Sequence, residues 1–440
     1  MLITAAQLPD GRRRDIRITD GSIAAVEQSL ALREDEVLLD AAGRTLMPGA
    51  IDVHVHFREP GYEHKETFHS GSRAAAAGGV TTIVDQPNTD PPTISGSAFD
   101  EKAIRAAESL VDYGLNGGVT DAWEPATLLE RPLFALGEVF MADSTGSMGI
   151  GDETFVAAVR RASEANIPVT VHAEDSEYFD PTALDGATGV GGDADAERWS
   201  RYRPPAAEIA AVERATSVAA KTDAQLHVAH TSTPEAVDHA AEAANVTCEV
   251  TPHHAFLSRE DAAELGTFGR MNPPLRSESD RAAVFDRIVD GTVDMIATDH
   301  APHTREEKQR SLTDAPSGVP GVETMVPLLL AAVRDGQLSL ERVRDLVAAT
   351  PAEVFGLSAK GRIEPGRDAD LALYDLDRVT QIDGEQLHST CSWTPFAGRD
   401  GVFPLATLVR GELVYVAPEA NIEAPFDGSF GPAIGRNVRQ

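Results

Sequence analysis

The segment AIDVHVHF, residues 50–57, is the first of eight short β-rich runs between residues 48 and 350. Alanine-rich segments with helical periodicity separate these runs, a pattern typical of repeated βα units around a parallel sheet. The other runs are VTTIVDQPN (80–88), YGLNGGV (113–119), LFALGEVFM (133–141), PVTVHAE (168–174), QLHVAHT (225–231), VTCEV (246–250) and VDMIATDH (293–300). Eight runs predict an α/β fold whose strands close into a TIM-type (β/α)8 barrel, with an open doubly wound sheet as the alternative.

Outside this repeat, both ends of the chain carry shorter alternating segments separated by glycine turns. DIRITDGSIAAV (15–26) lies near the amino terminus, and PLATLVRGELVYV (404–416) lies near the carboxyl terminus. Alternation with period two predicts small antiparallel strands. We therefore expect residues 1–49 and 355–440 to build one small β-sandwich domain, and residues 50–354 to build the barrel.

The composition is strongly acidic. Asp and Glu number 70 against 38 Lys and Arg, which gives a formal net charge of -32. Such a surface repels nucleic acid and is best tolerated where salt screens it. Because lysine is so rare among the basic residues, we expect a protein from the cytoplasm of a halophile. The alternative is an acidic mesophilic protein.

Three features of the chain bear on its location. The longest apolar stretch, residues 325–333, is far too short to cross a bilayer. The basic cluster near the amino terminus follows the apolar residues, which is the wrong order for a secretory signal. The two cysteines cannot form a disulfide framework. The sequence therefore predicts a cytoplasmic protein with no membrane partner.

Ionisable residues collect at the carboxyl ends of the predicted strands, where a barrel carries its active site. His54 and His56 share one face of the first strand, because side chains alternate with period two. Imidazole and carboxylate ligands without cysteine suit Zn²⁺, with Mn²⁺ or Co²⁺ as substitutes. The predicted metal ligands are His54, His56, Glu138, His172, His230 and Asp299.

Two longer motifs identify a family. DVHVHFREPG (52–61) and ATDHAPHTREEK (297–308) look like the two signature patterns of dihydroorotases, the second ending in a lysine. PNTDPP (87–92), VHAED (171–175), HVAHTST (227–233), MNPPLRS (271–277) and APSGVPGVET (315–324) also resemble blocks of that family, in its order. The chain thus resembles the metal-dependent amidohydrolases, and among them the dihydroorotase family, over nearly its whole length.

The resemblance implies a reaction and a set of roles. Family members interconvert dihydroorotate and N-carbamoyl-aspartate in pyrimidine synthesis, using one or two zinc ions to activate water for attack on a ring amide. By resemblance, Asp299 binds metal and moves protons between water and the ring nitrogen. The residues that match substrate-binding positions are His56, Arg58, Asn88, Asn272, His303, Ser317 and Gly318.

The chain departs from many family members at one place. Where they bridge two metals with a carboxylated lysine on the fourth strand, this sequence has Glu138 and no nearby lysine. Glu138 could bridge instead, if Gly137 lets the strand approach more closely. Asp143 is a rival bridging group, and Glu138 could also serve only to orient a ligand. We expect two zinc ions per chain, with one as the alternative.

Other functions compete with this interpretation. Allantoinases and hydantoinases open similar cyclic ureides with the same metal chemistry, but a substrate without a carboxylate has no need of Arg58. A catalytically dead barrel could instead scaffold a pyrimidine-pathway partner, although such a protein would tolerate loss of the metal ligands. The sequence predicts a small-molecule substrate and leaves a homo-oligomer open.

Overall fold

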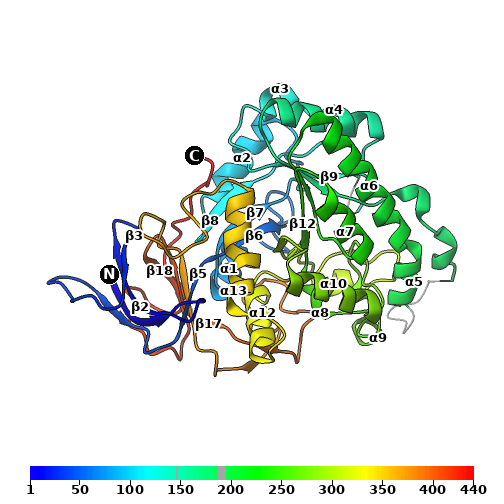
Figure 1. Ribbon diagram of the computed structural model, residues 1–440. Coiled ribbons are helices and arrows are strands. Elements are labelled where there is room, and N and C mark those ends of the chain that lie inside the picture. Colours follow the sequence, from blue (N-terminus) through cyan, green and yellow to red (C-terminus); the bar gives the residue numbers. More distant parts are fainter. Residues whose placement is uncertain (145–146, 187–194) are drawn as a thin grey trace.

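Eight parallel strands form the centre of the protein. The computed structural model describes residues 1–144, 147–186 and 195–440 (Figure 1). The strands lie in two parallel sheets, of three and five strands. They are β6 (Ala50–Val55), β7 (Val80–Asp85), β8 (Asp112–Leu115), β9 (Leu136–Phe140), β10 (Val169–His172), β11 (Leu226–Val228), β12 (Val246–Val250) and β13 (Met295–Ile296). Each overlaps one of the eight predicted runs.

Two isolated parallel bridges join the two sheets, one at each end of the strand order. Gly117 after β8 pairs with Leu136 of β9, and His300 after β13 pairs with Val55 of β6. The second seam is reinforced by Asp52, whose carboxylate accepts hydrogen bonds from Thr298 N at 3.0 Å and Thr298 Oγ1 at 2.5 Å. Strands that follow one another along the chain thus lie side by side, and their carboxyl ends share one edge.

Helices cover the outside of these strands (Figure 1). The alanine-rich α6 (Pro205–Thr222) shows why: Ala207, Ala211 and Ala215, four residues apart, form a buried stripe. The other helices are α1 (Phe68–Ala77), α2 (Gly96–Ala106), α3 (Pro125–Leu128), α4 (Asp152–Glu164), α5 (Asp195–Tyr202), α7 (Pro234–Glu242), α8 (Pro252–Phe256), α9 (Ala262–Leu265), α10 (Glu278–Asp290), α11 (Arg305–Lys308), α12 (Met325–Arg334), α13 (Leu340–Arg344) and α14 (Thr350–Val354). In the described part of the chain, no helix is long and apolar enough to span a membrane.

The two chain ends meet in one eight-stranded sheet. The strand order is β18-β17-β14-β5-β1-β2-β3, and β4 pairs with β1. Its members are β1 (Leu2–Gln7), β2 (Arg13–Thr19), β3 (Ser22–Glu27), β4 (Leu38–Asp40), β5 (Thr45–Pro48), β14 (Leu371–Tyr374), β17 (Pro404–Val409) and β18 (Glu412–Val416). The remaining strands, β15 (Thr380–Gln381) and β16 (Asp400–Gly401), form a separate pair. The sheet lies on the side of the first parallel strands, β6, β7 and β8 (Figure 1).

A buried ion-pair network joins this sheet to the parallel strands. Lys360 Nζ lies 2.7 Å from Asp112 Oδ2 at the start of β8 and 2.5 Å from Asp370 Oδ2 beside β14. Arg410 also pairs with Asp112. Because all four groups are largely shielded from water, removing one would leave a buried charge without its partner, which typically costs about 3–5 kcal/mol. The network therefore fixes the sheet against β8.

Candidate active site

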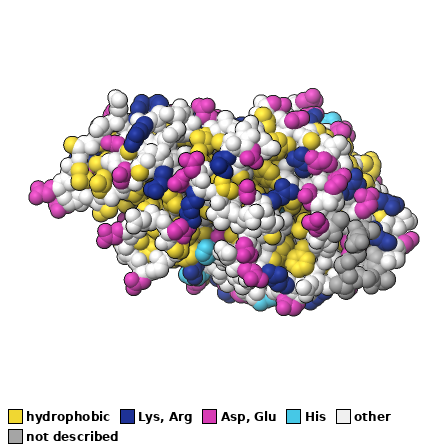
Figure 2. All heavy atoms as spheres, turned by 90° about the horizontal axis from the view of Figure 1, so that it is seen from below, with side chains coloured by type: hydrophobic (Ala, Val, Ile, Leu, Met, Phe, Trp, Pro, Cys, Tyr) yellow, Lys and Arg dark blue, Asp and Glu magenta, His cyan; other side chains and the backbone are white. Residues whose placement is uncertain are grey.

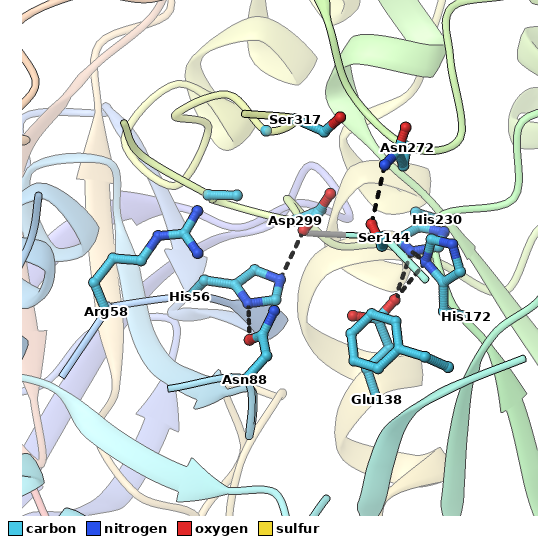
Figure 3. A pocket seen from close by; sticks show the side chains of 13 residues that line it. His56, Arg58, Asn88, Glu138, Ser144, His172, His230, Asn272, Asp299 and Ser317 are labelled. Atoms are coloured by element: carbon cyan, nitrogen blue, oxygen red, sulfur yellow. Dashed lines mark hydrogen bonds and ion pairs between the residues drawn. The ribbon is translucent and has the colours of Figure 1, made fainter. Parts of the chain in front are cut away.

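A pocket opens at the carboxyl ends of the parallel strands. It is lined by most of the predicted site residues (Figure 3). Phe140, Ser144 and Ala301 also line it, and the sequence patterns did not single them out. Among the described residues, only His54 and His303 of the predicted set lie outside the lining.

Three of the site residues have an unusual backbone. Arg58, His230 and Asp299 have φ angles of 69°, 36° and 47°, in the left-handed region that side-chain-bearing residues rarely adopt. All three come just after a strand ends. The turned backbone directs each side chain towards the pocket, and such strain is typical of functional sites.

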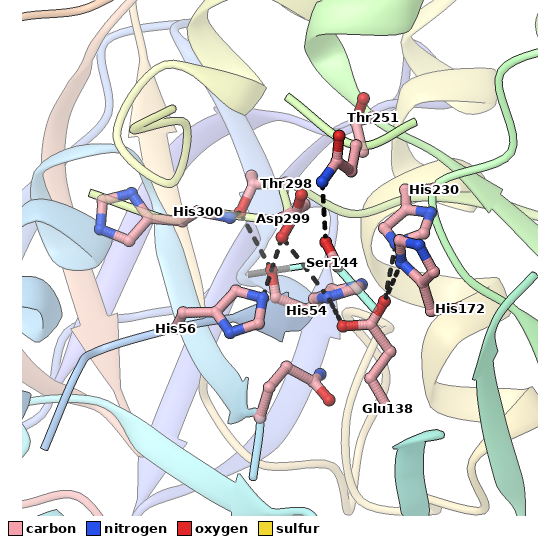
Figure 4. Close-up of polar contacts among 12 residues, drawn as sticks. His54, His56, Glu138, Ser144, His172, His230, Thr251, Thr298, Asp299 and His300 are labelled. Atoms are coloured by element: carbon pink, nitrogen blue, oxygen red, sulfur yellow. Dashed lines mark hydrogen bonds and ion pairs between the residues drawn. The ribbon is translucent and has the colours of Figure 1, made fainter. Parts of the chain in front are cut away.

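Two groups of potential metal ligands lie next to each other. The first is His54, His56 and Asp299, and the second is His54, Glu138 and His230, with all donor atoms of each group within 4.8 Å of one another. The two groups share His54 and face each other across the site (Figure 4). This arrangement brings together residues from four strand ends.

Glu138 is the centre of the second group. Its Oε1 lies 2.7 Å from His230 Nε2 and 3.0 Å from His172 Nδ1, and its Oε2 lies 3.3 Å from His54 Nε2. Gly137 makes this possible, because a Cβ there would lie only 2.1 Å from Thr170 Oγ1 on the neighbouring strand. Glycine thus lets β9 approach β10 closely, as a bridging Glu138 requires.

Asp143, the rival bridging group, faces elsewhere. It is exposed, and its Oδ1 accepts the backbone N–H of Gly149 at 2.7 Å. Its carboxylate belongs to neither potential ligand group among the described residues. The geometry therefore favours Glu138 over Asp143 as the carboxylate that faces the histidines.

One observation tests whether a cation fits here. His54 Nε2 is buried and has no hydrogen-bond partner among the described residues. It lies between carboxylate oxygens of Glu138, at 3.3 Å, and Asp299, at 3.6 Å. An unpaired buried imidazole nitrogen among carboxylates is costly unless a cation occupies the space between them. The donor set therefore fits a metal ion.

Two carboxylates to which the sequence patterns gave no role orient these histidines. Glu249 accepts from His54 Nδ1 at 2.6 Å, and Glu174 lies 2.9 Å from His172 Nε2. Burial opposes ionisation of Glu174, but the nearby Arg203 and His172 lower its pKa to about 2. Carboxylates behind ligand histidines fix their tautomer and ring orientation. Glu249 could have been found as an acidic residue inside an otherwise apolar strand run.

The opposite side of the pocket is cationic. Arg58 is held by Pro302 O, 3.1 Å from its Nε, and its guanidinium points towards His56 and Asp299 (Figure 3). Burial lowers the pKa of Arg58 to about 10, so the group stays charged at neutral pH. Asn88 Oδ1 lies 2.7 Å from His56 Nδ1 and so fixes that ring as well. This side of the pocket can hold an anionic group beside the metal ligands.

His303 lies behind Arg58 rather than on the pocket wall. Its Nδ1 is 3.2 Å from Lys65 Nζ, which can only donate, so the ring proton belongs on Nε2. Nε2 then donates to Ser317 O at 2.9 Å, and Arg58 Nη2 lies 3.1 Å from it. With its proton on Nε2, His303 accepts from Lys65 and donates to the loop that carries Ser317 and Gly318, and its ring packs beside Arg58 without accepting a hydrogen bond from it.

Relatives found by sequence agree with this geometry. A model of the amidohydrolase family matches residues 45–424. The dihydroorotase of Halobacterium salinarum is 57% identical over 441 residues, covering 100% of both chains. The dihydroorotase of Methanosarcina acetivorans is 42% identical over 443 residues, covering 98% of this chain and 94% of its own.

Solved structures with the same fold are also found. The L-hydantoinase (dihydropyrimidinase) from Arthrobacter aurescens has a TM-score of 0.90 at 28% identity, covering 99% of this chain and 98% of that chain. The dihydropyrimidinase from Brevibacillus agri has a TM-score of 0.87 at 29% identity, covering 100% and 98%. Matches in sequence and in structure thus span the whole chain and include every strand end described above. The chain belongs to the amidohydrolase family.

Proposed function

We propose that the protein is a dihydroorotase, which reversibly hydrolyses (S)-dihydroorotate to N-carbamoyl-L-aspartate in pyrimidine synthesis. Relatives with that name match the chain from end to end at 57% and 42% identity. The observation that carries the proposal is Arg58, a buried cation on the pocket wall opposite the histidines. It suits a cyclic amide that bears a carboxylate.

A closed (β/α)8 barrel is the fold we propose for residues 50–354. The two bridges that join the sheets support it, since they leave no unpaired edge between β8 and β9 or between β13 and β6. We assign residues 1–49 and 355–440 to a second, β-sandwich domain, supported by the pairing of β5 with β14.

The metal centre we propose holds two Zn²⁺ ions. His54, His56 and Asp299 would hold one, and His172 and His230 the other, with Glu138 between them. When bound, zinc polarises a carbonyl and makes water nucleophilic near neutral pH. Two donor groups that overlap at His54 support two ions rather than one, and His172 joins the second group through Glu138 Oε1, 3.0 Å from its Nδ1.

The chain's own residues would bind the substrate and move the proton. Arg58 and Asn88 would bind the substrate carboxylate, with His303 behind Arg58. Asn272, Ser317 and Gly318 would contact the ring, and His56 would touch both the metal and the substrate. Asp299 would take a proton from the attacking water and deliver it to the departing ring nitrogen. Its Oδ1 lies 2.9 Å from His56 Nε2, which keeps the carboxylate aimed at the pocket.

A second candidate is a hydantoinase-type activity, favoured by the structural matches to hydantoinases. The deciding experiment compares hydrolysis of dihydroorotate, dihydrouracil, hydantoin and allantoin by the zinc-loaded protein, followed by ultraviolet absorbance. We expect dihydroorotate to be turned over far faster than the uncharged rings. Faster turnover of hydantoin or dihydrouracil would overturn the assignment, and turnover of none would indicate a scaffold.

We also propose that the enzyme works in the cytoplasm of a halophile on its small-molecule substrate, without nucleic acid. Acidic side chains spread over the face seen in Figure 2 instead of gathering in one patch. This distribution supports a general adaptation to salt rather than a specific docking surface. Whether the chain forms a homo-oligomer is left to a direct measurement of its mass in solution.

A further inference from the structure

The lysine that ends the second signature motif has no role in the chemistry above. Lys308, at the end of α11, is fully buried, with 0% of its surface exposed. Its Nζ lies 3.0 Å from Arg270 O, 2.9 Å from Pro316 O and 3.0 Å from Gly318 O. Burial lowers the pKa of Lys308. Three carbonyl acceptors, however, match the three N–H donors that only the protonated form has.

These carbonyls belong to two segments that form one wall of the pocket. The first segment leads from Arg270 to Asn272, and the second surrounds Ser317 and Gly318. The segments also contact each other directly: Gly318 N donates to Arg270 O at 3.0 Å, and Arg270 Nε donates to Ser317 Oγ at 3.1 Å. Lys308 is thus the point where both segments are tied to a common donor.

The wall has little freedom once it is tied. A Cβ on Gly318, whose φ is 124°, would lie 2.7 Å from Ala301 Cβ, so this loop packs directly against the pocket floor. The indole Nε1 of Trp199 donates to Asn272 Oδ1 at 3.0 Å, and the amide nitrogen of Asn272 donates to Ser144 Oγ on the pocket lining at 3.2 Å. Small movements of either segment would therefore displace the groups that face the substrate.

A buried cation is an expensive way to fill this space. Taking an ammonium group out of water carries a desolvation penalty that its partners must offset. A methionine could occupy the volume, but it would leave three carbonyl oxygens without donors and would not fix their relative positions. The desolvation cost of burying Lys308 is offset in function when the geometry of the wall determines how the substrate binds.

We propose that Lys308 is a positioning residue that aligns Asn272, Ser317 and Gly318 with the substrate ring by holding their two segments together. This inference rests on the proposed function, since it assumes that the ring binds against this wall. Lys308 contacts none of the proposed metal ligands. Its loss should therefore weaken substrate binding and leave the metal centre intact.

The test compares Lys308→Met with a matched control, Lys360→Met. Lys360 is a second buried lysine, held by Asp112 and Asp370 at the junction with the β sheet, away from the pocket. For Lys308→Met we expect KM for dihydroorotate to rise about tenfold or more, kcat to change less than threefold, and zinc per chain to stay unchanged. Lys308→Gln, whose amide supplies two N–H donors, should show a smaller rise in KM.

The Lys360→Met control separates an effect on substrate positioning from a general loss of stability. Lys360→Met should lower the melting temperature yet keep KM within twofold of the wild type. A wild-type KM in Lys308→Met, or an equal rise of KM in Lys360→Met, would overturn the inference. If Lys308→Met does not fold, Lys308→Gln carries the same test. Should the wild type fail to hydrolyse dihydroorotate, the proposed function fails first, and that result is seen before any variant is compared.

Discussion

Replacing Arg58 by methionine tests the basis of substrate recognition. Methionine keeps much of the side-chain length and removes the charge. Arg58 stays cationic in a buried position, so its hydrogen bonds to a substrate carboxylate should be strong. A hydrogen bond to a charged group contributes about 1.5–3 kcal/mol. A loss of about 3 kcal/mol corresponds to a fall in kcat/KM of roughly 100-fold.

The fall in kcat/KM of Arg58→Met should depend on the substrate's charge. For dihydroorotate we expect the full reduction, because its carboxylate loses its cationic partner. For dihydrouracil, which has the same ring amide without the carboxylate, we expect a change of less than about threefold. The assay is the ultraviolet absorbance of the ring amide in zinc-loaded protein, with zinc content measured in each sample.

Arg131→Met is a matched control. Arg131 forms a surface pair with Asp100, with its Nε 2.8 Å from Asp100 Oδ1, so its loss should change neither substrate's kinetics. Equal losses on both substrates in Arg58→Met would show that Arg58 only supports the architecture of the site. Unchanged turnover of dihydroorotate would refute its role in binding the carboxylate.

Further predictions concern the metal, the proton, a buried thiol and salt. Glu138→Ala should lower the zinc content from two ions to one per chain by elemental analysis; an unchanged content would leave Glu138 only an orienting role. Asp299→Asn should abolish turnover while circular dichroism stays native, and retained turnover would exclude the proton transfer. Burial raises the pKa of Cys391 to about 11, whereas an unfolded thiol ionises near 8.5. The folded state is therefore favoured most below about pH 8.5 and loses about 1.4 kcal/mol per pH unit above it, up to about pH 11. Chemical denaturation of Cys391→Ala should lack this part of the slope; an identical slope would contradict it. Raising NaCl from low to molar concentration should increase the melting temperature by screening the charge of -32; a fall would favour the mesophilic alternative.

The fold was predictable where local pattern and topology agree. The short β-rich runs coincide with β6–β13 because branched and apolar residues in them are buried on both faces, as parallel strands require. The run at 113–119, although it holds three glycines, overlaps β8. The shared texture of the two chain ends predicted one common β domain, but the pairing of β5 with β14 could not be predicted, since no local signal records which distant strand a strand will join.

The site was less fully predictable. The strand-end histidines and Asp299 lie together because the topology brings strand ends to one edge. The left-handed backbone at Arg58, His230 and Asp299 leaves no mark in residue type, so the direction of these side chains could not be read from the sequence. The position of His303 depends on Lys65 and Ser317, which approach it only after the loops fold. Glu174 and Glu249 act through histidines, so motifs centred on ligands overlooked them.

The pairing of β5 with β14 has a consequence for synthesis of the chain. The strand at residues 45–48 leaves the ribosome early, yet its partner at residues 371–374 emerges only near the end of translation. Until then, an edge of the amino-terminal strands has no neighbour, and such exposed edges invite pairing with other nascent chains. A truncated message should therefore yield aggregates rather than a working barrel, even though every residue that faces the pocket has already been made.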